Sequence, residues 1–129
     1  MNYSFRKKNK KVKYIVIHYT GMESFKRAIS KLNNLNSDVS CHYLISKSGL
    51  IFNLLCPSFK AWHAGKSQWK DVKNLNDYSV GIELENKGHD HGYNNFSSNQ
   101  YSSLKKLITF LSKNFQIQHQ NIIFHSDIS

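Results

Sequence analysis

Two short apolar segments constrain the fold of this chain more than any other feature. Residues 13–19 (KYIVIHY) and 79–84 (SVGIEL) are rich in β-branched side chains. Runs of this length and composition are typical of strands buried inside a sheet. A third run, residues 121–124 (NIIF), has the same character. We therefore predict three buried strands.

Two amphipathic helices are predicted between these strands. Residues 24–35 place apolar side chains three or four positions apart, and residues 97–100 have the form of a capping box before a longer apolar stripe. Residues 40–46 and 50–55 are strand-like and flank a turn that contains glycine, which predicts a hairpin. The resulting order of elements indicates a mixed α/β domain with helices packed on one sheet.

The chain is short and strongly basic. It has 129 residues, with 18 Lys and Arg against 8 Asp and Glu, and a formal net charge of +10. Six of the 18 basic residues lie within the first 13 positions. We expect a solvated basic tail over residues 1–12 and one domain over residues 13–129. The other lysines are scattered and form no recognisable nucleic-acid motif, so no nucleic-acid partner is expected.

The sequence carries no evident membrane or disulfide signal. No apolar run approaches the ~18 residues that span a bilayer, and the apolar segment after the basic N-terminus is too short for a secretory signal. We expect a cytoplasmic protein without a membrane span, with export by another route left open. Cys41 and Cys56 match no zinc-ribbon spacing, and we expect two free, buried thiols.

Two histidines come at the ends of strand-like runs. His18 closes the run KYIVI, and His125 closes the run NIIF. Both could point from strand ends into one site, and imidazole is a common ligand of zinc. Two histidines do not by themselves specify a metal, and local hydrogen bonding is the alternative role.

Glu83 lies between two large apolar residues in the run SVGIEL. A carboxylate in a buried apolar strand must be paired, protonated or functional. The alternative is an edge strand from which Glu83 faces solvent. Glu85 lies on the same face but next to polar Asn86, so it is the weaker candidate.

Residues 56–77 show no sustained period and include the only proline, so we predict one long loop, of a length that is often functional. This segment carries Trp62 and His63, which either bind a substrate or order the loop by packing. The remaining histidines are expected in structural or solvated positions: His42, His89, His91 and His119.

Five segments occur in one order over nearly the whole chain. They are VIHYTG at 16–21, VSCHYLI at 39–45, AWHAGKS at 61–67, LNDYSVGIELEN at 75–86 and FHSDI at 124–128. This series resembles the zinc-dependent N-acetylmuramoyl-L-alanine amidases, whose fold phage amidase lysozymes and peptidoglycan-recognition proteins share. The resemblance implies a mixed central β-sheet flanked by helices, an α/β (α+β) arrangement, with a zinc cleft along one face. It also implies hydrolysis of the amide between N-acetylmuramic acid and L-alanine.

Matched position by position, the resemblance assigns zinc binding to His18 and His125. It assigns the catalytic carboxylate to Glu83, which would take a proton from zinc-activated water and pass it to the leaving amine. It places His63, with Trp62, in a loop that lines the substrate cleft. Peptidoglycan or a muropeptide is the implied partner, and we expect a monomer.

The family pattern continues beyond residue 129. Family members carry a further stretch of the form APGRKxDPG, whose last Asp is the third zinc ligand and whose Lys stabilises the transition state. Asp127 matches a position that is not a ligand in the family. We therefore expect a C-terminally truncated amidase that binds one Zn²⁺ weakly and hydrolyses little or nothing. The alternatives are a non-catalytic muropeptide-binding module and a basic nucleic-acid-binding protein.

Overall fold

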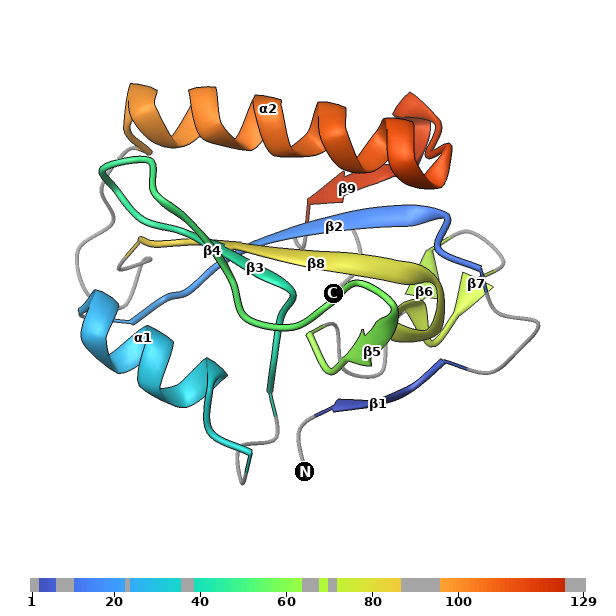
Figure 1. Cartoon of the computed structure of the whole chain (residues 1–129), viewed down its shortest axis with the longest axis horizontal. Helices are drawn as coiled ribbons and strands as arrows, with labels where there is room; N and C mark the ends of the chain where they lie inside the picture. Colours follow the sequence, from blue (N-terminus) through green and yellow to red (C-terminus); the bar gives the residue numbers. More distant parts are fainter. Residues whose placement is uncertain are drawn as a thin grey trace.

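A computed structural model describes residues 3–6, 11–22, 24–35, 39–63, 68–69, 72–86 and 96–124. The main sheet is built from β2 (Tyr14–Tyr19), β3 (Tyr43–Ile45), β4 (Ile51–Asn53), β8 (Ser79–Leu84) and β9 (Ile122–Phe124). Its strand order is β4-β3-β8-β2-β9 (Figure 1). All neighbours run parallel except β3 and β4, which form the predicted antiparallel hairpin.

The three apolar runs form three of these strands, as predicted. β8 has the predicted bounds, and β2 and β9 each begin one residue later than expected. Ile15, Val80 and Ile82 on one face and Val16 on the other have no exposed surface. Both faces of the sheet are therefore covered, which explains why the runs are apolar throughout rather than alternating.

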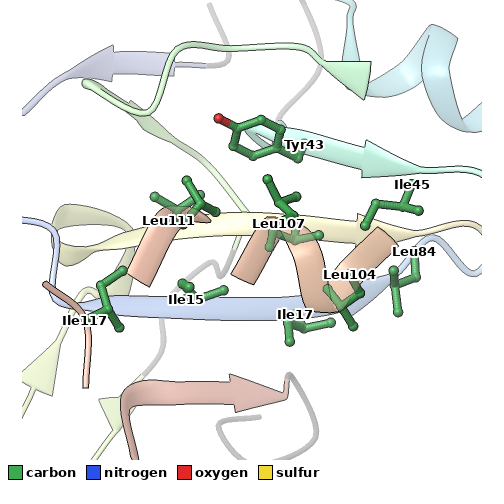
Figure 2. Packing of buried hydrophobic residues seen from close by; sticks show 11 residues of the cluster. Ile15, Ile17, Tyr43, Ile45, Leu84, Leu104, Leu107, Leu111 and Ile117 are labelled. Carbon is green, nitrogen blue, oxygen red and sulfur yellow. The ribbon is translucent and has the colours of Figure 1, made fainter. Parts of the chain in front are cut away.

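The long helix α2 (Ser98–Phe115) packs along one face of the sheet (Figure 1). The predicted capping box is present: Ser97 Oγ accepts from the Gln100 N–H at 3.0 Å, and Gln100 Oε1 accepts from the Ser97 N–H at 3.1 Å. Figure 2 shows the core beneath this helix, which is formed by Leu104, Leu107 and Leu111 of α2 and by Ile15, Ile17, Ile45 and Leu84 of the sheet.

The shorter helix α1 (Phe25–Leu32) lies on the opposite side of the sheet (Figure 1). Its Leu32 packs with Cys41 and Leu44. The helix ends three residues before the predicted boundary, because asparagine side chains compete for backbone hydrogen bonds and disfavour a continued helix. Within the part of the chain that the structure describes, neither helix is long and apolar enough to cross a membrane.

The prediction of one long loop over residues 56–77 is wrong. This segment contains β5 (Phe59–Ala61), β6 (Gln68–Trp69), β7 (Val72–Lys73) and the 3₁₀ helix η1 (Leu75–Tyr78). These strands have two or three residues each, too few to produce a recognisable period. β5 pairs antiparallel with β1 (Tyr3–Phe5), a partner that lies far away in the sequence.

Arg6 directly follows β1 and is part-buried, so the expectation that this residue belongs to a solvated tail is wrong. Its guanidinium donates hydrogen bonds to backbone carbonyls of residues 57, 76, 77 and 79. The basic N-terminal segment therefore contributes a residue to the folded domain.

Both cysteines are free, as predicted, but only Cys41 is buried. The Cys41 thiol donates to the Tyr43 carbonyl at 3.2 Å. Burial raises its pKa, and the nearby Glu83 carboxylate raises it further. Cys56 is exposed in the turn before β5, so the expected burial is wrong for this residue.

Candidate functional site

The parallel pairing of β2 and β8 places His18 and Glu83 side by side in register. The preceding pair, Ile17 and Ile82, packs into the core beneath α2. Because successive strand residues face opposite sides, His18 and Glu83 point away from α2. Two residues that the sequence singled out separately are therefore neighbours on one face of the sheet.

The Glu83 carboxyl is held in an unfavourable environment for a charge. Its Oε2 atom is buried and has no hydrogen-bond partner among the residues that the structure describes. Burial raises the pKa of Glu83 from 4.5 to about 8. Such a carboxyl exchanges a proton near neutral pH, which suits a general acid or base.

His63 joins His18 to the beginning of β8. Its Nδ1 lies 2.9 Å from Nε2 of His18, and its Nε2 lies 2.8 Å from Oγ of Ser79. The Ser79 hydroxyl donates to the carbonyl of Leu75 at 2.7 Å. The predicted cleft residue His63 and the predicted zinc ligand His18 are thus in direct contact.

The Leu75 carbonyl determines the direction of this chain of hydrogen bonds. A carbonyl can only accept, so the Ser79 hydroxyl gives its hydrogen to Leu75 and accepts one from Nε2 of His63. Nδ1 of His63 is then the unprotonated nitrogen. When both rings are neutral, Nε2–H of His18 donates to it.

Gly81 makes room for the His63 ring. A Cβ atom at position 81 would lie 2.5 Å from Cγ of His63, which is far inside normal van der Waals contact. Gly81 lies on β8 between Ser79 and Glu83, on the same face as both. Glycine is thus required here by the close approach of an imidazole.

His42 lies beside this group and has the structural role that the sequence predicted. It is fully buried; its Nδ1 accepts from the Gly81 N–H at 3.0 Å, and its Nε2–H donates to the Phe59 carbonyl at 2.8 Å. Burial, with a smaller contribution from the charge of Arg6, lowers the pKa of His42 to about 4. A neutral imidazole therefore ties β8 to β5.

Trp62 is anchored toward the N-terminal strand. Its backbone N–H donates to Ser40 Oγ at 2.8 Å, and its indole N–H donates to Ser4 Oγ at 3.3 Å. The next residue, His63, donates its backbone N–H to Asn76 Oδ1 at 3.2 Å. These contacts hold the segment that carries His63 against β1 and η1.

Several predicted residues lie outside the part that the structure describes: His125, Asp127, His89 and His91. His119 is exposed, as expected. Within the described ranges, no group of three or more His, Cys, Asp or Glu side chains is arranged to hold a metal. His18 is the described member of the predicted zinc pair.

The sequence analysis did not identify Ser79 and Asn76 as site residues. Ser79 binds the imidazole of His63, and Asn76 binds its backbone N–H. The period of a strand places Ser79 on the same face as Glu83, and this was a usable signal. The amide of Asn76 gave none, because its contact with His63 depends on η1, which was not predicted.

Residues 8–129 match the profile of the family described as N-acetylmuramoyl-L-alanine amidase. AmiD of Escherichia coli K12 is 32% identical over 131 aligned residues, which cover 92% of this chain and 46% of AmiD. The 1,6-anhydro-N-acetylmuramyl-L-alanine amidase AmpD of Haemophilus influenzae is 36% identical over 92 residues, which cover 70% of this chain and 48% of AmpD. The chain spans about half the length of the curated relatives it matches.

Solved structures with the same fold include AmpDh3 of Pseudomonas aeruginosa in complex with anhydromuramic pentapeptide. It has a TM-score of 0.85 and 31% identity, covering 98% of this chain and 56% of that one. E. coli AmiD in complex with its substrate, an anhydro-N-acetylmuramic acid peptide, has a TM-score of 0.82 and 31% identity, covering 95% and 52%. The predicted mixed sheet flanked by helices is confirmed.

Proposed function

Because this chain belongs to the N-acetylmuramoyl-L-alanine amidase family, we propose that it hydrolyses the amide bond between N-acetylmuramic acid and L-alanine in muropeptides. The observation that carries this proposal is the Glu83 carboxyl, whose Oε2 atom lies buried next to His18 without a described hydrogen-bond partner. A polar atom buried without a partner costs stability, and a catalytic role is one reason why a protein keeps such an atom.

Glu83 is proposed as the residue that moves the proton. Its carboxylate accepts a proton from the attacking water and then donates it to the leaving amine of L-alanine. Burial raises the pKa of this carboxyl to about 8 in the metal-free protein, which favours the form that donates a proton. A bound cation nearby would favour the carboxylate, which is the form that accepts a proton from water.

His18 and His125 are proposed to hold one Zn²⁺. The donor chemistry fits, since the imidazole of His18 stands at a strand end beside a buried carboxyl with an unpartnered oxygen. When bound there, Zn²⁺ polarises the scissile carbonyl and makes the attacking water more acidic. His63 fixes the orientation of the His18 ring through the 2.9 Å contact between Nδ1 and Nε2.

The proposed substrates are anhydromuropeptides. Two relatives at 31% identity have been crystallised with ligands of this class. His63 and Trp62 are proposed to line the cleft that receives the muramyl end. Their backbone contacts to Asn76 and Ser40 keep this segment in place.

The test is incubation of the purified, zinc-loaded protein with an anhydromuramyl peptide, with mass spectrometry of the products. The family pattern alone led to an expectation of little or no hydrolysis; the placement of Glu83 beside His18 leads us to expect release of the stem peptide instead. Glu83→Gln should lose at least about 10²-fold in activity, in line with removal of a general base. Glu85→Gln is the matched control and should retain activity. Binding of the muropeptide without release, equal in the wild type and Glu83→Gln, would show a non-catalytic binding module instead.

A further inference from the structure

Arg6 makes an unusually complete set of contacts for a residue near a chain terminus. Its Nε donates to the Pro57 carbonyl at 3.1 Å. Nη1 donates to the carbonyls of Asn76 and Asp77 at 3.0 and 3.1 Å, and Nη2 donates to the carbonyl of Ser79 at 2.7 Å. All four acceptors are backbone carbonyls, and the charge of the Asp77 carboxylate adds an electrostatic attraction.

Two of these acceptors belong to the residues that hold His63. Asn76 accepts the backbone N–H of His63 through Oδ1, and Ser79 accepts from Nε2 of its ring. The same two residues give their carbonyls to Arg6. One side chain therefore fixes both supports of His63 relative to each other.

A second path leads from the N-terminal strand to His63. β1, which ends just before Arg6, pairs with β5 so that Tyr3 lies opposite Ala61, two residues before His63. β1 is therefore connected to His63 in two ways: through its pairing with β5, and through the hydrogen bond from Arg6 to Asn76 of η1. These contacts join β1 to the strand that carries Ser79 and Glu83.

We propose that Arg6 is a positioning residue that holds His63, and through it His18, in the geometry of the site. The expected effect of Arg6 on catalysis rests on the proposed function, whereas its effect on the position of His63 does not. Within the described part of the chain, the hydrogen bonds of Arg6 go to residues 57, 76, 77 and 79 and not to His18 or Glu83. The planar fork of arginine can bond several carbonyls at once, whereas a lysine ammonium has a different reach and geometry.

The experiment compares Arg6→Ala and Arg6→Lys with Arg27→Ala and Arg27→Lys. Arg27 is the only other arginine of the chain, and its side chain is exposed on α1. Substituting it changes the net charge as the same substitution of Arg6 does. The first readout is the ¹⁵N NMR spectrum of the His63 ring in the metal-free protein, which reports the protonated nitrogen and its hydrogen bond. The second is the pair kcat and KM on an anhydromuramyl peptide.

We expect both Arg6 variants to lose the Nε2–H form of His63 bonded to Ser79, while the Arg27 variants keep it. A misplacement of this kind lowers kcat on the order of 10- to 100-fold with a smaller effect on KM. Millimolar guanidinium should restore the His63 signals and kcat in Arg6→Ala, but not kcat in His63→Ala.

Unchanged His63 ring signals in folded Arg6→Ala would overturn the proposal. If Arg6→Ala does not fold, Arg6→Lys carries the test, because it keeps the charge and the aliphatic stem; wild-type His63 signals in this variant would equally overturn it. The NMR readout stands without catalysis. If the wild type hydrolyses nothing, the proposed function fails while the His63 spectrum still decides the role of Arg6.

Discussion

At the scale of single residues, the site depends on one close approach between His63 and Gly81. Gly81→Ala places a methyl group 2.5 Å from the His63 ring, so the ring must move away from Ser79 and His18. We expect a loss of about 1–3 kcal/mol in the free energy of unfolding, measured by denaturant titration.

A double-mutant cycle isolates this contact. In a His63→Ala background, Gly81→Ala should cost much less, because the atoms that it would meet are gone. An equal cost in both backgrounds would show that the glycine serves the backbone of β8 rather than the imidazole.

The Glu83 carboxyl should give the metal-free protein a distinctive pH dependence. In the folded state it keeps its proton up to about pH 8, whereas in the unfolded chain it loses it near 4.5. Between these values the folded state binds more protons at Glu83, so this carboxyl makes the free energy of unfolding fall as pH rises. His42, whose pKa burial lowers from 6.5 to about 4, makes the opposite contribution between those two values. The contribution of Glu83 approaches about 1.4 kcal/mol per pH unit.

Chemical denaturation at a series of pH values, with a chelator present, measures this slope. Glu83→Gln should remove it, and Glu85→Gln should keep it. A slope that is the same in wild type and Glu83→Gln would contradict the raised pKa.

At the scale of elements, the start of α2 depends on its capping box. Ser97→Ala removes the oxygen that accepts from the Gln100 N–H and leaves that donor without its partner. We expect a cost of about 1 kcal/mol in thermal or denaturant unfolding. Ser102→Ala, on the exposed side of the same helix, is the matched control and should be neutral or slightly stabilising, because alanine has the higher helix propensity.

At the scale of the whole molecule, the zinc site proposed above would link metal binding to folding. A ligand that binds only the folded state at 100 times its Kd stabilises it by about 2.7 kcal/mol, which raises Tm on the order of 10 °C in a domain of this size. Calorimetry with and without Zn²⁺ should show this rise in the wild type. His119→Ala, at an exposed position, should keep the rise.

His18→Ala should lose that rise in Tm, because it removes a proposed ligand. An equal rise in His18→Ala would place the zinc elsewhere. This comparison needs no substrate, so it tests the metal site independently of hydrolysis.

The sequence by itself determined the main strands, both helices and the family of this protein. Local composition and spacing predicted the strands β2, β8 and β9 and the cap of α2. They also revealed the ordered motifs around His18, His63 and Glu83. These elements could be predicted because the burial of a strand and the cap of a helix depend on a few neighbouring residues. The family match over residues 8–129 confirms the resemblance that these motifs indicated.

Only the tertiary structure decided how the site is held together. The contact of His63 with His18, the support from Ser79, the need for glycine at position 81 and the four bonds of Arg6 join residues far apart in the chain. The short strand β5 forms because β1 pairs with it, and no local pattern reports such a partner. Long-range contacts of this kind arise only when the whole chain has folded, so sequence periodicity could not predict them.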